Sequence, residues 1–379
     1  TVGAQLVRAQ PVADGLNASY ARHLAERTIV NPFPGIVKLE RRLGHAVPVR
    51  IGSNEGLAEP RSPLEAAFGP ALAELARLYP DPYALALRER LAALNHCQPE
   101  EIIVDAGADS LILLALRLCV NPGDTVVCTA GSYPTFRYFA EGVGAKLREI
   151  PYEAHAGGLR PDWQALVEAA NAEQAALLYL ANPDNPTGHL WPGEVVAQLR
   201  AALTPDTLLL LDESYLDFAE LTERPADGPL PGVLRLRTLS KAYALAGARV
   251  GYAFADAALI DKADQIRPQF AVSSWAQAAA HTVLADPDYA PALRAHTLAL
   301  REALAEALRA RGRQPFASAT NFVCVACADR AEAEGIQGRL LAAGVALHRP
   351  PHPAVGHLLR ITAHPAALSE DVLAVLQKP

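Results

Sequence analysis

The sequence has no methionine, only five cysteines and no apolar run of membrane-spanning length. The longest apolar segment, residues 111–120, is broken by Arg117, so no transmembrane helix is predicted and no membrane partner is expected. The cysteines are too few and too irregularly spaced for a disulfide framework. Cys324 and Cys327 have C-x-x-C spacing, but they lie in an apolar strand pattern and no second pair completes a zinc site, so no metal site is predicted.

Charge of one sign is not concentrated in any part of the chain. The net charge of the 379 residues is −7, from 34 Lys and Arg against 41 Asp and Glu. Because the basic residues form no stripe, nucleic acid is not an expected partner. Residues 1–10 include Arg8 and Gln10 where a secretion signal needs its apolar block, which predicts a cytoplasmic protein.

Strand and helix patterns alternate between residues 50 and 265. Several of the strand patterns are near-continuous apolar runs, as expected for parallel strands that are covered on both faces. The predicted strands are 101–105, 124–129, 145–150, 176–181, 207–212, 233–238 and 249–254, with helical patterns between many of them, including 161–170 and 193–202. This order predicts an α/β domain with a largely parallel sheet.

The chain is long enough for one large domain and a smaller one. We interpret residues 1–50 as an irregular arm with part of the small domain, 51–280 as the large domain and 281–379 as a small α+β domain. Further helices are predicted at 62–78, 84–94, 276–284, 289–311, 330–343 and from 369, and further strands at 322–326, 345–348 and 357–362.

Polar residues stand at the carboxyl ends of four predicted strands. These clusters are 107–109, 182–188, 212–215 and 238–241. Ligands of open α/β sheets bind beyond the carboxyl ends of the strands, so the four clusters predict one shared site. The first cluster also precedes a strongly apolar helix, whose free N–H groups and dipole favour an anion, although such turns are common.

Lys241 is the centre of the predicted chemistry. It sits among small residues, with the hydroxyls of Thr238 and Ser240 before it and Arg249 after it. A partly desolvated lysine amine is a Schiff-base nucleophile towards an aldehyde, and the hydroxyls and arginine suit a phosphate. An aldehyde and a phosphate on one small ring describe pyridoxal phosphate, whereas the competing interpretation is an ordinary solvated loop lysine.

Four other residues suit such a ring, each with a structural alternative. Asp212 ends a run of four leucines, where a carboxylate needs a cation such as a pyridinium, unless it only caps the next turn. Tyr215 and Asn185 offer polar groups to the ring, although Tyr215 also suits a packed core position. Phe136 offers a ring to stack, although an aromatic residue here is more often part of the core.

Two arginines near the C-terminus suit an anionic substrate. Arg360 lies inside an apolar strand pattern, where its planar fork needs a carboxylate or phosphate. A salt bridge to a carboxylate of the protein is the alternative. Arg349 lies in a nearby loop and is either a second anion-binding group or simply exposed.

The full set of motifs resembles the histidinol-phosphate aminotransferase branch of the class I and II, fold-type-I pyridoxal-phosphate enzymes. The motifs are Tyr79-Pro-Asp, Gly107-Ala-Asp109, Pro134-Thr-Phe136, Asn182-Pro-x-Asn185-Pro-Thr-Gly, Asp212-Glu-x-Tyr215, Thr238-Leu-Ser240-Lys241 followed by Arg249, and Leu-Arg360-Ile-Thr. They cover nearly the whole chain in the family's order. The resemblance implies a mostly parallel seven-stranded sheet between helices, plus a smaller α+β domain.

The resemblance also implies roles for these residues, with pyridoxal 5'-phosphate as the cofactor. Lys241 would form the Schiff base, Asp212 would pair with the pyridinium nitrogen, Tyr215 and Asn185 would contact the ring hydroxyl and Phe136 would stack. The phosphate would be held by the backbone of Ala108 and Asp109 with Thr238, Ser240 and Arg249. Tyr79 would reach the site of a neighbouring subunit in a homodimer, and Arg360, Asn54 and Arg349 would face the substrate.

The implied activity is transfer of an amino group between an amino acid or a histidinol-phosphate-like amino-alcohol phosphate and 2-oxoglutarate. The alternatives are a decarboxylase on the same fold, similar to threonine-phosphate decarboxylase, and a non-catalytic regulator that keeps the cofactor site. Departures from the branch pattern at Gly56, at Ser110 and in 267–274 leave the amino donor open.

Overall fold

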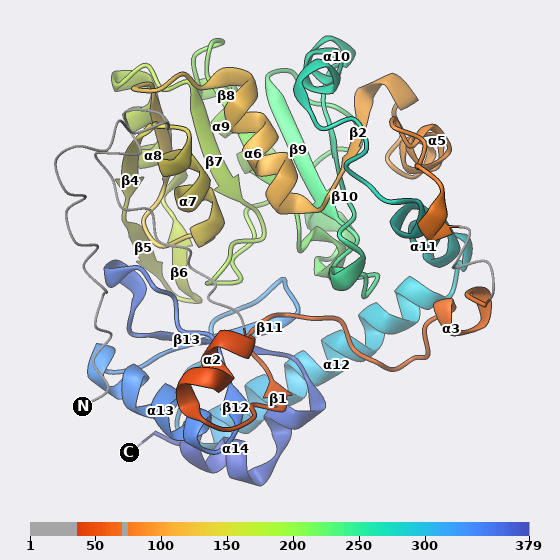
Figure 1. The fold of residues 1–379 in the computed structure, drawn as a ribbon. Helices are drawn as coiled ribbons and strands as arrows, with labels where there is room; N and C mark the ends of the chain where they lie inside the picture. Colours follow the sequence, from red (N-terminus) through yellow and green to blue (C-terminus); the bar gives the residue numbers. More distant parts are fainter. Residues whose placement is uncertain (1–35, 70–74, 379) are drawn as a thin grey trace, which may run out of the picture.

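The fold is described by a computed structural model that covers residues 36–69 and 75–378. A layer built on a large sheet lies above a smaller α/β layer, and the long helix α12 (Tyr289–Ala310) extends from beside the sheet layer into the lower one (Figure 1). Most of the predicted arm, residues 1–35, lies outside the described residues. The predicted helix 289–311 is confirmed as α12 to within one residue.

The upper layer contains a seven-stranded sheet with the strand order β2-β10-β9-β8-β7-β3-β4. The strands are β2 (Ile102–Asp105), β3 (Thr125–Thr129), β4 (Lys146–Ile150), β7 (Leu177–Ala181), β8 (Leu208–Asp212), β9 (Val233–Thr238) and β10 (Gly251–Phe254). β10 is antiparallel to both of its neighbours, and all other pairings are parallel. The predicted fold class, with its mostly parallel sheet, is therefore confirmed.

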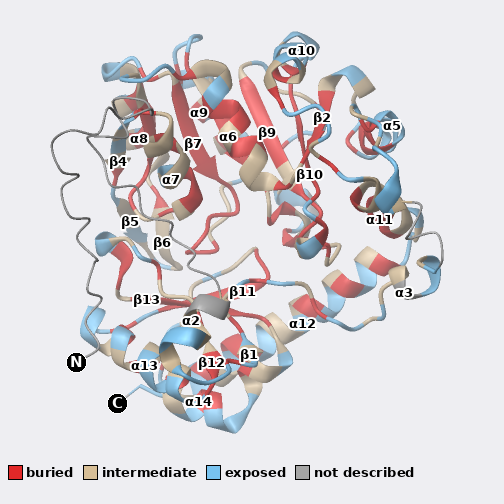
Figure 2. Ribbon diagram, in the orientation of Figure 1, coloured by how far each residue is buried: buried red, intermediate tan, exposed pale blue. Residues whose placement is uncertain are grey.

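Alternating residues of the central strands bury their side chains on opposite faces of the sheet, as the pleat requires. On β7, Leu177 and Tyr179 pack in the cluster covered by α6, α7 and α10, whereas Leu178 and Leu180 pack against α8 and α9. Figure 2 shows β7, β9 and β10 as buried strands between helices. The helices are α5 (Leu85–Leu94), α6 (Ala108–Cys119), α7 (Pro134–Gly142), α8 (Trp163–Ala172), α9 (Gly193–Ala202), α10 (Ala257–Ile266) and α11 (Ser274–Ala285).

A short hairpin precedes α8, where the prediction was wrong. β5 (Tyr152–His155) pairs with β6 (Gly158–Pro161), so residue 161 belongs to a strand and not to the predicted helix. The hairpin turns at Gly158, whose φ of +126° favours glycine. The helix begins only after Asp162, whose side chain caps it by accepting from Ala165 N at 3.0 Å.

The predicted helix 62–78 is also wrong as a continuous element. The structure has a short helix α3 (Leu64–Ala67), Phe68 is extended, with φ −104° and ψ 104°, and residues 75–77 are again helical. Pro70 explains the break, because a proline disfavours helical geometry at the preceding residue, Gly69. Residues 70–74 lie outside the described part of the chain.

The lower layer is built on two small sheets and three helices. β11 (Phe322–Ala326) pairs antiparallel with β13 (Leu358–Thr362), and β1 (Val49–Arg50) pairs parallel with β12 (Val345–Ala346). The helices are α2 (Ile36–Leu43), α13 (Arg330–Ala342) and α14 (Glu370–Leu376). In the part of the chain expected to be partly irregular, residues 36–50 form α2 and β1, and β1 is a two-residue strand that pairs with β12.

One hydrophobic cluster holds this lower layer together. It joins Ile51 to side chains of α12, α13, α14, β11 and β13. In Figure 1 the carboxyl ends of β7 and β9 point towards β11 and β13. The loops after the large sheet therefore face the lower layer across a shared boundary.

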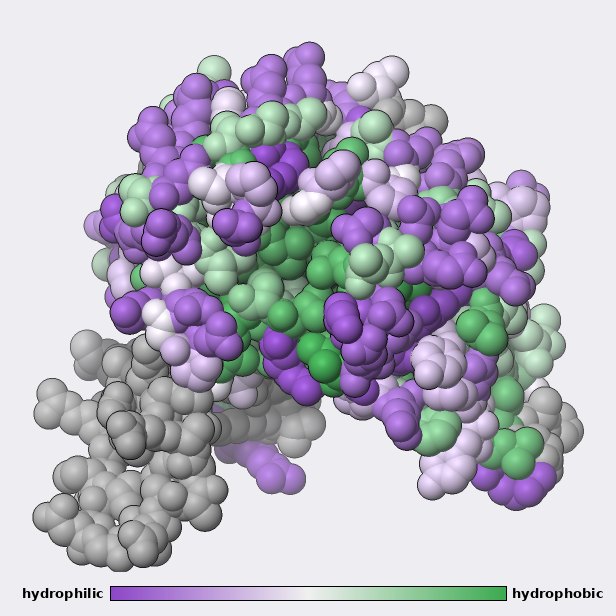
Figure 3. Space-filling view, turned by 90° about the horizontal axis from the view of Figure 1, so that it is seen from above, coloured by the Kyte–Doolittle hydropathy of each residue, from purple (hydrophilic) through white to green (hydrophobic). Residues whose placement is uncertain are grey.

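The opposite end of the sheet layer is seen in Figure 3. Hydrophilic side chains dominate the periphery of that face, and hydrophobic ones gather towards its centre. Among the described residues, no helix is both long and apolar enough to cross a membrane.

Candidate active site

The four strand-end clusters meet at the boundary between the two layers. Arg360 of β13 donates from Nη1 to Asn185 Oδ1 in the loop after β7, at 2.5 Å. The Lys241 amine donates to the Ser53 carbonyl at 3.2 Å and lies 5.9 Å from the centroid of the Tyr215 ring. Residues that are far apart in sequence thus surround Lys241, as the parallel-sheet argument requires.

The turn that carries Lys241 is packed closely against the segment after β1. A Cβ added at Gly56 would lie 2.6 Å from Ala244 Cβ and 3.2 Å from the Lys241 carbonyl oxygen. Asparagine, the residue that the branch pattern places at 56, would need this turn to move. Glycine at this position therefore belongs to the local packing of the lysine turn.

A compact cradle of donors lies beside Lys241. The Thr238 hydroxyl donates to Ser240 Oγ at 2.8 Å, and the first turn of α6 begins at Ala108. Arg249, at a φ of +57°, places its Nη2 3.7 Å from a carboxylate oxygen of Asp109. Helix N–H groups, hydroxyls and a guanidinium are groups that can donate hydrogen bonds to an anion.

Two glycines make this cradle possible. A Cβ at Gly107, which has a φ of +85°, would lie 2.6 Å from Arg249 Nη2. A Cβ at Gly251 would lie 2.8 Å from the carbonyl carbon of Gly107. The backbone at the start of α6 can approach both Arg249 and β10 only because these side chains are missing.

Asp212 is a buried carboxylate without a cationic partner among the described residues. It accepts from the Tyr179 hydroxyl at 2.8 Å and from Ser214 N and Oγ at 3.0 and 2.5 Å. Burial raises the pKa of the Asp212 carboxyl, and the hydrogen bonds from Ser214 and Tyr179 oppose that rise. A cation at this position would complete the pairing that its neighbours leave open.

Tyr215 and Asn54 are joined by a hydrogen bond. Asn54 Nδ2 donates to the Tyr215 hydroxyl at 3.0 Å, while Asn54 Oδ1 accepts from the Thr362 hydroxyl at 2.8 Å. Asn54 is 1% exposed and has a φ of +54°. Its side chain is therefore held by both layers and fixes the position of the Tyr215 hydroxyl.

Arg360 is a buried guanidinium, and no described carboxylate forms an ion pair with it. Its two hydrogen-bond partners are the neutral oxygens of Asn185 and Gly52, at 2.5 and 2.6 Å, and its Nε has no partner. Burial lowers the pKa of the Arg360 side chain. The alternative of a salt bridge within the protein is wrong for the described residues, so the charge is available to an external anion.

The two aromatic residues of the 133–136 segment lie in different surroundings. Phe136 is 1% exposed and stacks on Tyr179, with ring centroids 4.5 Å apart. Tyr133 precedes α7 and donates its hydroxyl to Asp109 Oδ1 at 2.8 Å, beside the cradle. Sequence reasoning missed Tyr133; the available signal was Pro134, which starts the helix and leaves Tyr133 in the strand-end loop.

Two other predicted site residues, Arg349 and Tyr79, contact neighbouring groups of the protein. Arg349 bonds to Gln337 and Gly356 and lies 3.4 Å from a Glu334 carboxylate oxygen, so its contacts are to protein groups. Tyr79 is 85% exposed, and its ring lies 5.0 Å from that of Phe270. Their predicted roles are not tested by these contacts.

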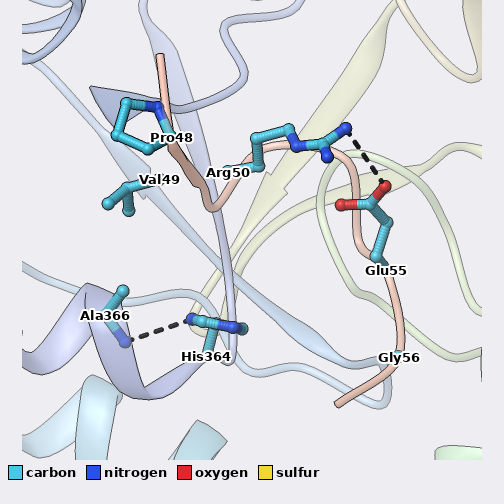
Figure 4. Close-up of a pocket in the computed structure, with 7 residues that line it drawn as sticks. All are labelled: Pro48, Val49, Arg50, Glu55, Gly56, His364 and Ala366. Carbon is cyan, nitrogen blue, oxygen red and sulfur yellow. Dashed lines mark hydrogen bonds and ion pairs between the residues drawn. The ribbon is translucent and has the colours of Figure 1, made fainter. Parts of the chain in front are cut away.

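A crevice of about 220 Å³ opens behind the segment that carries Asn54 (Figure 4). Arg50 and Glu55 form an ion pair of 3.7 Å across it, and His364 Nδ1 accepts from Ala366 N at 3.1 Å. Because its polar groups are already paired, we assign this crevice no ligand.

The sequence model of the aminotransferase class I and II family matches residues 58–377. The chain belongs to this family. Membership confirms the family that the motifs indicated.

Individual members of the aminotransferase family are similar over most of the chain. The histidinol-phosphate aminotransferase of Anaeromyxobacter sp. (strain Fw109-5) is 35% identical over 306 residues, 79% of this chain and 82% of that protein. That of Rhodospirillum rubrum is 34% identical over 315 residues, 79% of this chain and 83% of that protein.

Solved aminotransferase structures are similar as well. The Sinorhizobium meliloti histidinol-phosphate aminotransferase, solved with pyridoxal-5'-phosphate, has a TM-score of 0.86 at 33% identity and covers 96% of each chain. A Thermus thermophilus aspartate aminotransferase mutant has a TM-score of 0.74 at 25% identity, covering 95% of this chain and 98% of that one. Two relatives with different named substrates share the fold, so the fold alone does not select the amino donor.

Proposed function

We propose that the protein is a pyridoxal-phosphate-dependent aminotransferase. It would move an amino group from an amino acid or a histidinol-phosphate-like amino-alcohol phosphate to a 2-oxo acid such as 2-oxoglutarate. The observation that carries the proposal is that Lys241 follows β9, next to β8, which ends in the buried Asp212 that lacks a cation, and directly follows the hydroxyls of Thr238 and Ser240. The two histidinol-phosphate aminotransferases described above support the choice of donor class.

The site fits pyridoxal 5'-phosphate by its donor set. The Asp212 carboxylate would pair with the protonated ring nitrogen, and Asn185 and Tyr215 would contact the ring hydroxyl. The phosphate would lie on the backbone N–H groups of Ala108 and Asp109, with Thr238, Ser240 and Arg249 around it. When bound, this cofactor supplies an electron sink for the carbanion that forms when the substrate loses its α-proton.

Residues of the chain would carry out proton transfer, bind the substrate carboxylate and position the Tyr215 hydroxyl. Lys241 would hold the cofactor covalently and, once released by the incoming amine, move the α-proton as a general base and then a general acid. Arg360 would bind the substrate carboxylate with its unpaired Nε and its fork. Asn54 would hold the Tyr215 hydroxyl in place from the substrate side.

For the aromatic residue that stacks on the cofactor, Phe136 stays the prediction, and we propose Tyr133 as a second candidate. One face of the Phe136 ring is already covered by Tyr179, and its side chain belongs to the core between the sheet and α6. Tyr133 lies at the cradle through its hydrogen bond to Asp109. For Arg349, a substrate role would require it to leave Glu334, so we keep it as a secondary candidate.

A homodimer, a cytoplasmic location and the division into domains at about residues 50 and 280 belong to the same proposal. Leu78, Tyr79, Tyr83 and Phe270 expose between 47 and 85% of their surface. A cluster of exposed aromatic and aliphatic side chains is typical of a surface that pairs with another chain. Tyr79 would reach the phosphate cradle of the second subunit.

The experiment is an absorbance titration with pyridoxal 5'-phosphate, followed by amino donors. The wild type should gain a visible absorbance band that a true donor bleaches, with release of an oxo product and no carbon dioxide. Lys241→Ala should lose the band and slow turnover by about a thousandfold or more, because no other residue replaces the nucleophile. The control Lys262→Ala, an exposed lysine of α10, should behave as the wild type.

An absence of the band in wild-type protein would refute the proposal. Carbon dioxide release in place of an oxo product would favour the decarboxylase alternative. A stable band without any turnover would favour the non-catalytic regulator.

A further inference from the structure

Asp184 is a buried carboxylate in the loop between β7 and α9, next to Asn185. It is 1% exposed. Its Oδ2 accepts from the Tyr152 hydroxyl at 2.9 Å and from Thr187 Oγ1 and N at 2.7 and 3.2 Å, and its Oδ1 accepts from Ser132 Oγ at 3.2 Å. All four donors are neutral, and no described lysine, arginine or histidine forms an ion pair with this carboxylate.

This arrangement is unfavourable for stability on its own. Burial raises the pKa of the Asp184 carboxyl to about 6, although the hydrogen bonds from Thr187, Tyr152 and Ser132 oppose that rise. A carboxylate without a cation in a dry environment costs more than a neutral side chain of the same shape. Its retention in this loop therefore needs a reason other than packing.

The contacts of Asp184 join three segments, two of which carry a site residue. Ser132 also lies 3.4 Å from the Asn185 carbonyl oxygen, so its single hydroxyl bridges the loop before α7 to the loop after β7. Ser132 precedes Tyr133, whose hydroxyl reaches Asp109. Tyr152 belongs to the β5–β6 hairpin.

Asn185, the neighbour of Asp184 in the chain, contacts the buried guanidinium of Arg360. Asn185 Oδ1 accepts from Arg360 Nη1 at 2.5 Å, which is one of the two hydrogen bonds that the Arg360 side chain makes with described residues. A rotation of the Asn185 backbone would move Oδ1 and release one arm of the fork. Asp184 fixes that backbone from one side through Thr187 and from the other through Ser132.

We propose that Asp184 is a positioning residue, which holds Asn185 and Ser132 so that Arg360 presents its fork to the carboxylate of the substrate. The inference rests on the proposed function, because it assumes that Arg360 binds a carboxylate. It assigns Asp184 no contact with substrate or cofactor. Its effect is on carboxylate affinity and not on the chemistry at Lys241.

The proposal makes a specific claim about the conservative variant. In Asp184→Asn, the amide oxygen can accept from Thr187 and Tyr152, while the amide nitrogen donates to Ser132 Oγ. The Ser132 hydroxyl then keeps its own proton for the Asn185 carbonyl. Asparagine should therefore preserve the arrangement, whereas Asp184→Ala removes every acceptor.

The experiment is a calorimetric titration of the cofactor-loaded protein with glutarate, a five-carbon dicarboxylate that cannot accept an amino group. Asp184→Ala should weaken glutarate binding about tenfold, because small misplacements of a positioned group cost affinity and rate at this scale. Asp184→Asn should stay within about threefold of the wild type, and Ser132→Ala should lose about threefold or more. In turnover, Asp184→Ala should raise KM for the oxo acid more than it lowers kcat.

The control is Asp162→Ala, which removes the cap of α8 at a distance from the site. It should lose stability and keep the wild-type affinity for glutarate, which separates positioning from general destabilisation. The proposal is overturned if Asp184→Ala binds glutarate as the wild type does, or if Asp184→Asn loses as much affinity as Asp184→Ala. Should Asp184→Ala not fold, Ser132→Ala with wild-type affinity overturns it equally.

If the proposed aminotransferase function is wrong, glutarate binding should change differently among the variants. If wild-type protein and Arg360→Ala bind glutarate equally, Arg360 is not the carboxylate site and the proposed function is wrong. If Arg360→Ala alone loses binding while all Asp184 and Ser132 variants keep it, only the positioning role is wrong.

Discussion

Asp212 and Glu213 are adjacent in sequence and both buried, yet their partners differ completely. Glu213 lies between two arginines: Arg235 Nη2 is 2.8 Å from Oε1, and Arg237 Nε is 3.0 Å from Oε2. The remaining Nη1 of Arg235 donates to the carbonyls of Ala226 and Gly228, each at 2.6 Å. Asp212 accepts only from hydroxyls and one backbone N–H.

The difference separates buried charge that is paired within the chain from buried charge that has no ionic partner among the described residues. The Glu213 network compensates its charges within the chain, so it can hold strands and loops together without a ligand. Asp212 and, on the far side of the site, Arg360 have no ionic partner among the described residues. Successive residues of a strand point to opposite faces, which is how one strand end supplies both kinds of group.

The largest expected effect is on the stability of the protein when the Glu213 ion pairs are removed. Glu213→Ala should lower the free energy of unfolding by about 3–5 kcal/mol, because it leaves the fully buried Arg235 without its carboxylate. Urea denaturation of the cofactor-free protein measures this. The control Glu220→Ala breaks an exposed pair with Arg294 at 3.3 Å and should cost less than about 1 kcal/mol. Equal losses for the two variants would contradict the comparison.

Asp212→Asn should have the opposite effect, with little change in stability and a large loss of turnover. Its stability should change by about 1 kcal/mol or less, because a neutral amide replaces a carboxylate whose pKa burial already raises. Turnover should fall by about 10²–10³-fold, since the ring nitrogen of the cofactor loses its charged partner. Urea curves and steady-state kinetics on one preparation test both halves. A large loss of stability with normal turnover would show that Asp212, like Glu213, has a structural role.

The smallest effect concerns His189, a half-buried base in the loop that carries Asp184. Burial, with His155 and Arg160 nearby, lowers the pKa of His189 to about 4. The unfolded chain takes up this proton near pH 6.5, so the stabilisation is complete above that pH and is lost as pH falls towards 4. Between pH 7 and pH 5 the loss should be about 1–2 kcal/mol.

The test is the pH dependence of the unfolding free energy. His189→Asn should flatten the slope between pH 7 and pH 5 relative to the wild type. His296→Asn removes an exposed ring and should leave the slope unchanged. An identical slope in wild type and His189→Asn would show that His189 is protonated in the folded protein.

Sequence patterns predicted the sheet because each strand is a short apolar run that must be covered on both faces. The four-leucine run before Asp212 and the apolar run before Asn182 are such cases, and both became central strands. The strand-end rule then placed Lys241, Asp212 and Asn185 at one edge before any contact was known. These predictions use local chemistry and one topological rule, so they need no coordinates.

Other features depend on partners that sequence does not reveal. Gly158 and Pro161 form a hairpin only because Tyr152 pairs across it, and β1 forms only beside β12. Phe136 and Tyr133 have the same kind of side chain three residues apart. The path of the chain into α7 buries Phe136 in the core and brings the Tyr133 hydroxyl beside Asp109.

The sequence by itself therefore determined the fold class and the family and predicted Lys241 as the nucleophile, because apolar periodicity and a lysine in its motif are local properties. The tertiary structure decided which charges are compensated: Glu213 meets two arginines, while Arg360 meets only neutral oxygens. It also decided that Asp184 joins three segments. Compensation and positioning depend on distances between residues far apart in the chain, and packing alone sets those distances.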